Sequence, residues 1–364
     1  MSTSSKSKSV FLIGPGLVGR EILDLLLAEQ YSVTTLVRRE SYAAEIRESA
    51  AAAGAQVQTV VASLDDSSTI QAQTVVHDVV IHTATADHLA SVEAVIAGVE
   101  ARARLGKQTI FIHTSGTSLL SDDSRGEYRG DRIFDDARPQ DIDALPDTAA
   151  HREIDLAIVR ARDRLASAGA RAKLAIVIPP LIYGLNPKYG RLSIQLPTLT
   201  RFALKHGYAG HVGKGASVWS DIHVFDLARA YVVLLHWLER DDSDAADDLR
   251  ANPYFFCESG HDFSWADAAA VIGKELHNAG RIPSPVPTPI PVQNYDDLFG
   301  HFTPWVVGSN SRSRATRLRS LGWEPREKSL FDSLTQDEIP LILQENLDTF
   351  HGYAGVAVSG VMPP

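Results

Sequence analysis

The sequence predicts an α/β protein with a doubly wound parallel sheet and a smaller C-terminal substrate lobe. A strand, a glycine-rich turn and a helix follow one another at the N-terminus. Short β-rich runs then alternate with amphipathic helical patterns, and this regularity ends near Pro179. Such an alternation is typical of a parallel sheet with helices on both faces.

The N-terminal unit begins with the apolar run Val10 to Ile13. The first two glycines after it allow the backbone to turn sharply and to approach a pyrophosphate, and the third lets the helix pack closely on the strand. A helical apolar pattern and a second strand at 32–37 complete a βαβ unit. The predicted cofactor-binding residues of the turn are Gly14, Pro15, Gly16, Leu17, Val18 and Gly19.

Two arginines follow the second strand, where NAD-binding folds usually carry an acidic residue for the ribose hydroxyls. A guanidinium suits a 2′-phosphate, so Arg38 and Arg39 favour NADP(H) over NAD(H). The alternative is that both are solvated residues at a strand end.

The strand and helix pattern up to residue 180 predicts the first of two domains. Further strands are expected at 56–62, 78–84, 108–115 and 173–179, with helices at 40–53, 87–105 and 149–168. These elements form a dinucleotide-binding Rossmann domain over 10–180, onto which a helix within 222–240 packs back.

The second lobe is predicted over 181–221 and 241–364. It is rich in proline and glycine loops, and helices are expected near 193–206, 264–280 and 328–348. The polar segment 1–9 is predicted to be a disordered tail.

Composition narrows the class of protein. The chain has 364 residues, 44% of them hydrophobic, and a formal net charge of −10, which argues against nucleic acid or an anionic membrane as partner. The N-terminus lacks the apolar core of a signal peptide, and no run has membrane-spanning length. The single cysteine, Cys257, is typical of a cytoplasmic protein, and the histidines show no metal-ligand spacing. We therefore expect a small-molecule substrate, no nucleic acid, no membrane and no metal.

Five segments in order carry a family resemblance: Ile13 to Gly19, Val80 to Ala84, Phe111 to Ser115, Pro179 to Gly184 and Ile222 to Ala228. Together they resemble the extended short-chain dehydrogenase/reductases, the NAD-dependent epimerase/dehydratase group, and the resemblance covers nearly the whole chain. It implies that Thr83 and Ala84 line the adenosine and diphosphate side of the cofactor. It places Thr114 and Ser115 beneath the nicotinamide. It also places the segment Pro179 to Tyr183, which includes Pro180 and Leu181, over the carboxamide edge. It also implies a homodimer, since family members commonly pair through two sheet-covering helices.

The chain departs from the family pattern in two places. Extended members usually begin the turn G-x-x-G-x-x-G, and Ile13 stands at the first of those glycines. The family's catalytic Ser/Thr, Tyr and Lys correspond to Gly116, His151 and Asp155. The usual proton donor is therefore replaced.

His151 and Asp155 are the leading catalytic candidates. At about 100° per residue, His151 lies near the apolar stripe of its helix and Asp155 at the rim of that stripe. A histidine can donate or accept a proton at neutral pH, and Asp155 can orient the imidazole or accept a bond from a ribose hydroxyl. The alternative is a helix-start cap with an Asp155–Arg152 ion pair.

Three further residues are candidates to replace the family's catalytic Ser/Thr hydroxyl or Tyr phenol. Ser115 and Thr117 flank the position of the family's Ser/Thr, although either can instead bond the loop backbone. Tyr183 can present a phenol to the nicotinamide pocket or can pack as an ordinary aromatic side chain.

The predicted function is that of an NADP(H)-dependent oxidoreductase acting on a small organic carbonyl, alcohol or conjugated alkene with an atypical proton donor. Two alternatives remain open. One is a non-redox isomerase, lyase or cyclase on the same fold, and the other is a non-enzymatic NADP(H) sensor related to the NmrA-like regulators.

Overall fold

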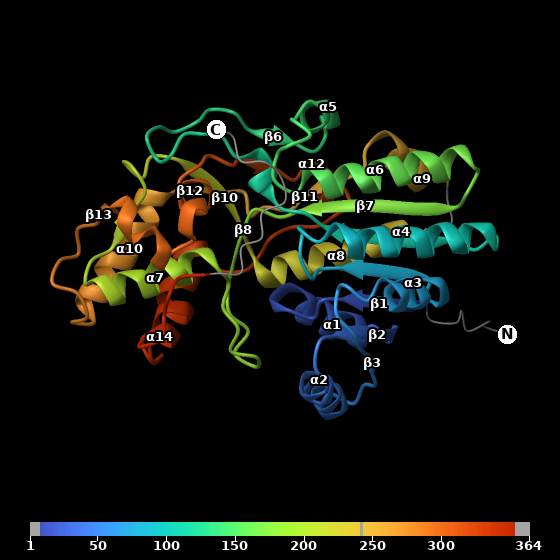
Figure 1. Cartoon of the computed structure of the whole chain (residues 1–364), viewed down its shortest axis with the longest axis horizontal. Coiled ribbons are helices and arrows are strands. Elements are labelled where there is room, and N and C mark those ends of the chain that lie inside the picture. Colours follow the sequence, from blue (N-terminus) through green and yellow to red (C-terminus); the bar gives the residue numbers. More distant parts are fainter. Residues whose placement is uncertain (1–7, 241–242, 354–364) are drawn as a thin grey trace.

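The computed structural model describes residues 8–240 and 243–353, and Figure 1 shows a sheet domain on the right and a smaller lobe on the left. The predicted tail at 1–9 lies outside the described residues except at its end, where Ser9 begins the first strand. Its hydroxyl donates to Asp78 Oδ2 at 3.0 Å, which fixes the start of that strand.

A seven-stranded parallel sheet forms the centre of the first domain, in the order β11-β7-β5-β4-β1-β2-β3. This confirms the doubly wound α/β fold. Because β1 is central and the chain winds outward from it in both directions, the ends of β1 and β4 border the switch point of the sheet. The strands are β1 Ser9–Ile13, β2 Ser32–Val37, β3 Gln58–Val61, β4 Val79–His82, β5 Thr109–Thr114, β7 Ala172–Ile178 and β11 Tyr254–Phe256.

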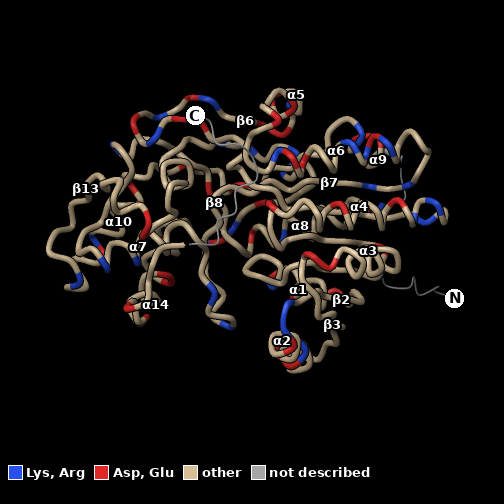
Figure 2. Tube along the Cα trace, viewed as in Figure 1, with Lys and Arg blue, Asp and Glu red and all other residues tan. Residues whose placement is uncertain are grey.

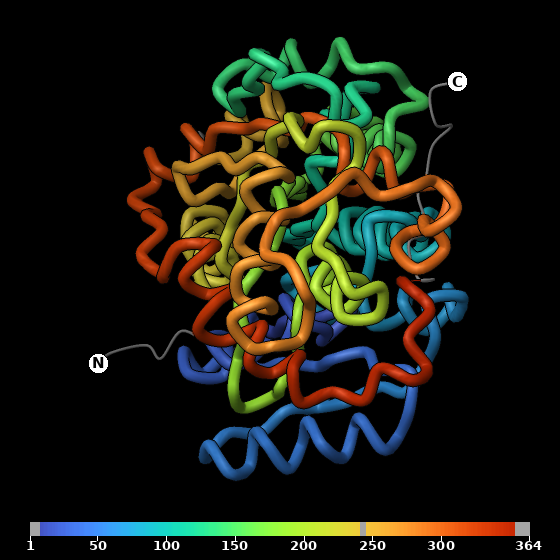
Figure 3. The backbone as a smooth tube through the Cα atoms, turned by 90° about the vertical axis from the view of Figure 1, so that its left-hand side faces the viewer, coloured from blue at the N-terminus to red at the C-terminus, as the bar shows by residue number. Residues whose placement is uncertain are grey.

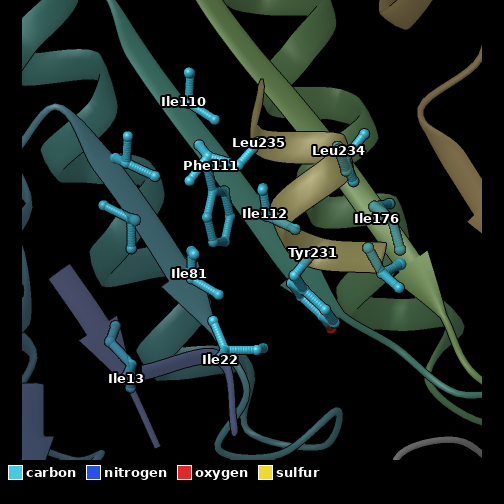
Figure 4. Close-up of a cluster of buried hydrophobic side chains, with 14 of the residues drawn as sticks. Ile13, Ile22, Ile81, Ile110, Phe111, Ile112, Ile176, Tyr231, Leu234 and Leu235 are labelled. Carbon is cyan, nitrogen blue, oxygen red and sulfur yellow. The ribbon is translucent and has the colours of Figure 1, made fainter. Parts of the chain in front are cut away.

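Helices cover both faces because the central strands are apolar on both sides. On one face α1 packs against α8, and on the other α3, α4 and α6 pack side by side. In Figure 4, Ile22 of α1 and Tyr231 and Leu234 of α8 lie against the apolar strand residues. The first-domain helices are α1 Leu17–Ala28, α2 Glu40–Ala52, α3 Ser67–Val76, α4 Leu89–Arg104, α5 Pro139–Asp143, α6 Arg152–Ser167, α8 Val224–Leu238, α9 Ser243–Ala251 and α12 Thr316–Ser320.

The second lobe has its own apolar core, in which Leu181, Phe202 and Trp265 are buried. Its sheet has the order β12-β10-β8, and short pairs join β13 to β9 and β14 to β6. Its strands are β8 Leu181–Tyr183, β9 Gly210–His211, β10 Val218–His223, β12 Asp262–Ser264 and β13 Thr288–Pro289, with β6 Phe134–Asp135 and β14 Ser313–Arg314 beside it. Its helices are α7 Gln195–His206, α10 Trp265–Asn278, α11 Thr303–Val306, α13 Leu330–Ser333 and α14 Ile339–Ile342.

Two expectations about this lobe were wrong. Residues 241–364 do not all belong to it, because β11 extends the large sheet beside β7 and Trp323 is buried in the first core. The helix expected over 328–348 is broken into α13, a π-helical turn at Leu334–Glu338 and α14. Pro340 lies at the start of α14 and cannot donate the bond that a continuous helix needs.

Four buried carboxyl groups make stability depend on pH. Burial raises the pKa of Asp136, Asp155, Asp221 and Glu338 to about 7 in each case. The native state therefore keeps protons that the unfolded chain releases near pH 4 to 5. Stability from these groups falls as pH rises toward 7.

Glu338→Gln tests this linkage. Glu338 Oε1 accepts from the Gly184 N–H at 3.0 Å and from Ser333 Oγ at 3.1 Å, and a glutamine carbonyl can accept both bonds without ionising. Urea unfolding at pH 5, 6, 7 and 8 should show the variant gaining stability over the parent as pH rises, by at most about 1.4 kcal/mol per pH unit. The exposed control Glu324→Gln should follow the parent, and parallel curves for Glu338→Gln and the parent would contradict the account.

Candidate functional site

The glycine turn is fixed by its contact with the end of β4. Gly14 has φ +91°, and a Cβ on it would lie 2.3 Å from Ala84 Cα. A Cβ on Gly19 would lie 2.2 Å from the Gly14 carbonyl oxygen. Thr83 Oγ1 donates to that same carbonyl at 2.7 Å. Any other residue at either glycine would push the turn away from the sheet.

Gly16 has a different part in the turn. A Cβ there meets nothing within 4 Å, so this face of the backbone is open. The helix α1 begins after Gly16 with no side-chain cap and no acidic residue in its first turn, which contains the predicted Leu17 and Val18. Its first N–H groups and the positive end of its dipole are therefore available to an anion such as a diphosphate.

A cavity of about 350 Å³ opens beside this turn, at the carboxyl ends of β1, β2 and β4. It has three arginines in its lining and no acidic residue. In the part of the chain that the structure describes, none of the three arginines forms an ion pair. The lining residues are Gly14, Pro15, Gly16, Leu36, Val37, Arg38, Arg39, Tyr42, Leu64, Thr83, Ala84, Thr85 and Arg191.

Seven of the predicted cofactor residues therefore meet at one cavity, from three separate segments. Sequence reasoning missed Tyr42 and Arg191. The Tyr42 hydroxyl donates to the Pro15 carbonyl and so holds α2 to the glycine turn. An aromatic residue three positions after the arginine pair was the available signal for Tyr42. Arg191 comes from the second lobe and gave no local signal.

His151 lies next to an acidic residue that the sequence did not single out. Its Nδ1 is 2.7 Å from Asp87 Oδ1, and both side chains are 12% exposed. His151 has φ +65°, immediately before α6, a conformation that costs a non-glycine residue free energy and is common at functional sites. The Nε2 atom faces Gly116, where a Cβ would come within 3.3 Å. The ion pair between Asp155 and Arg152, which the sequence offered as the alternative, is not among the bonds of either residue in the described structure.

Asp155 is fully buried, not at the rim of its helix as expected. Its Oδ2 accepts from Ser115 Oγ at 3.0 Å. Desolvation raises its pKa to about 7, while His151 and the Ser115 bond act in the opposite direction. Near neutral pH this carboxyl is divided between its neutral and charged forms, so it can hold or release a proton there.

Two more histidines lie on strands of the large sheet, near His151. His82 and His113 are opposite each other on β4 and β5, with ring centres 5.3 Å apart. Burial lowers the pKa of His82 to about 4 and that of His113 well below its usual value. Both rings are neutral at pH 7, so neither is an imidazolium acid there.

The other predicted site residues have mainly structural contacts. Thr114 Oγ1 donates to the His82 carbonyl at 2.8 Å and bonds the Tyr231 hydroxyl. The Thr117 N–H donates to the Pro179 carbonyl at 3.0 Å. The Tyr183 hydroxyl donates to the Lys328 carbonyl at 2.9 Å inside the second lobe, away from the cavity lining. Pro180 and Leu181 are buried at the junction of the lobes and do not line the cavity either.

No helix in residues 8–240 and 243–353 has both the length and the apolar character that a membrane span requires.

No family model matches the chain. It is 29% identical over 336 residues to the oxidase ucsJ of an Acremonium species, an alignment that covers 88% of this chain and 93% of the relative.

Solved structures resemble it along almost its whole length. Yeast methylglyoxal/isovaleraldehyde reductase Gre2, solved with NADPH, superimposes with a TM-score of 0.61 at 16% identity, covering 93% of this chain and 100% of that one. A dTDP-glucose 4,6-dehydratase of Bacillus anthracis, solved with NAD, gives 0.62 at 12% identity and covers 93% and 97% of the two chains. With the glycine turn and the sheet order, these likenesses confirm the predicted resemblance: the chain has the fold of the extended short-chain dehydrogenase/reductases.

Proposed function

We propose that this protein is an NADP(H)-dependent oxidoreductase that acts on a small organic carbonyl, alcohol or conjugated alkene. The observation that carries the proposal is the cavity at the switch point, where an open glycine turn meets arginines that have no acidic partner among the described residues. An NAD-selective site would place a carboxylate near Arg38, and none lines this cavity.

The residues present fit a dinucleotide phosphate. The first turn of α1 can hold the diphosphate, and Arg38 and Arg39 at the end of β2 can hold the 2′-phosphate. Thr83 and Ala84 limit the cavity on the β4 side. When bound, the nicotinamide would supply or accept the hydride, and the chain's own groups then handle the proton.

His151 is the proposed proton donor to the substrate oxygen or carbon. Asp87 lies against Nδ1 and holds the ring in one orientation, and Nε2 faces Gly116. Ser115 and Asp155 lie on the sheet side of the same site and form a neutral hydrogen-bonded pair when Asp155 is protonated. In this arrangement Ser115 is the hydroxyl that can orient the substrate, as the sequence suggested.

The relatives support the same reaction class. Gre2 is a reductase solved with NADPH and ucsJ is named an oxidase. A cytoplasmic location and a homodimer stay predictions from the sequence.

The cofactor preference is tested by titrating NADPH and NADH into the protein and its Arg38→Ala variant by calorimetry. The parent should prefer NADPH, and the variant should lose about tenfold to a hundredfold in NADPH affinity with little change for NADH, because one charged hydrogen bond contributes about 1.5–3 kcal/mol. Arg104→Ala is the surface control. No binding of either dinucleotide below about 1 mM would contradict the proposal, as would equal losses for both.

The glycine turn gives a test that does not depend on the 2′-phosphate. Gly16→Val should leave the melting temperature nearly unchanged, because the new side chain enters open space. It should abolish measurable binding of both NADPH and NADH, because that space is where the pyrophosphate would lie. Unchanged binding would mean that the cofactor does not lie across this turn.

His151→Asn tests the proton donor, and asparagine is chosen because it tolerates the left-handed backbone at this position. Oxidation of NADPH with a panel of aldehydes, ketones and enones should fall about a hundredfold to ten-thousandfold, while NADPH affinity stays the same. The matched control is His206→Asn, which removes another histidine paired with an aspartate, 2.8 Å from Asp297 in the second lobe. Equal turnover in the parent and His151→Asn would contradict the assignment, and binding without turnover of any substrate would favour the sensor alternative.

A further inference from the structure

The segment 184–191, which we call the strap, joins β8 to the start of the second lobe's helical part. At its beginning the Gly184 N–H donates to Glu338 Oε1 at 3.0 Å within the second lobe. It then crosses to the first domain. In Figure 1 the strap extends below β8. In Figure 3 the same yellow-green loop reaches the blue N-terminal elements.

Polar contacts hold the strap to α1. Asn186 Nδ2 donates to both carboxylate oxygens of Glu21, at 2.7 and 2.8 Å. The Tyr189 hydroxyl donates to Asp24 Oδ2 at 2.6 Å, and Lys188 Nζ donates to the same oxygen at 3.2 Å. These contacts place the strap directly beside the helix that begins at the glycine turn.

Arg191 leaves the strap toward the cavity. Its guanidinium carbon lies 4.8 Å from the ring centre of Tyr42, whose hydroxyl is bonded to the glycine turn at Pro15. Arg191 lines the cavity with Arg38 and Arg39, and the described residues offer it no ion pair. Basic residues on the turn before α2 and on the strap are visible in Figure 2.

A buried cation lies under the strap as well. Arg20 is 2% exposed, and its guanidinium carbon is 4.3 Å from the ring centre of Tyr189. Its Nε and Nη1 atoms have no hydrogen-bond partner among the described residues. A buried guanidinium with unsatisfied donors costs free energy that a nearby anion would reduce.

We propose that Arg191 of the strap is a third phosphate-binding arginine, which contacts the 2′-phosphate of NADP(H) from the second lobe, opposite Arg38 and Arg39. The inference rests on the proposed function and names a further specificity residue for it. A 2′-phosphate carries up to two negative charges near neutral pH and accepts bidentate bonds from guanidinium groups. NAD(H) presents only a hydroxyl there, so Arg191 gains a charged partner with NADP(H) alone.

This contact has a consequence for the two lobes. The strap continues into α7, which belongs to the second core. A bond from Arg191 to the 2′-phosphate therefore connects the second lobe to the cofactor. Bonds from Arg38 and Arg39 connect the cofactor only to the sheet domain.

The test is calorimetric titration of the full chain with NADPH, NADH, adenosine 2′,5′-bisphosphate and 5′-AMP. Arg191→Ala should weaken NADPH and the bisphosphate by about tenfold to a hundredfold and change NADH and 5′-AMP by less than about twofold. Arg191→Lys should keep part of the preference, because it keeps the charge but not the planar fork. Lys214→Ala is the matched control, since it removes an exposed cation of the second lobe that neither holds the strap nor lines the cavity, and it should bind all four ligands as the parent does.

The outcomes separate the inference from the proposed function. If the parent prefers NADPH and Arg191→Ala keeps the full preference, or loses all four ligands equally, the inference is wrong and the proposed function stands. If the parent binds neither dinucleotide, both are wrong. The melting temperature of each variant is measured as well, so that a loss of ligand binding is distinguished from unfolding of the variant.

Discussion

The close approach of the glycine turn to the end of β4 is the contact on which the rest of the site depends. Gly14 and Gly19 allow it, because a Cβ at either position would overlap Ala84 or the turn itself. The contact sets where α1 begins, and thereby where its uncapped N–H groups point. The cavity exists because β1 and β4 are neighbours whose following segments leave the sheet in different directions.

The cavity brings three arginines together, and its lining contains no acidic side chain. Several arginines elsewhere in the described structure are paired with acids: Arg312 and Arg314 both bind Asp262, and Arg229 binds Asp226. The cavity arginines have no such acid, although the chain carries a net charge of −10. Three arginines that share one cavity lining with no acidic side chain suit an anionic ligand such as a phosphate.

The sequence was sufficient for elements whose signal is local. The turn at Gly14, the strand ends with Thr83 and Thr114, and the helix at α8 were all predicted from residue type and spacing. Contacts between distant segments were not predicted. Asp87 meets His151 across 64 residues, and Arg191 reaches Tyr42 only because the strap crosses between lobes. The burial of Asp155 was likewise missed, since helical periodicity places a residue on a face but does not tell which neighbouring elements close over that face.

The cavity is proposed to hold NADP(H) with its nicotinamide toward His151. A crystal structure of the protein soaked with NADP⁺ is the most direct measurement. We expect the diphosphate at the start of α1, the 2′-phosphate within hydrogen-bond distance of Arg38, and the nicotinamide C4 face open to a space that His151 borders. A dinucleotide bound elsewhere, or a nicotinamide ring directed away from His151, would contradict it.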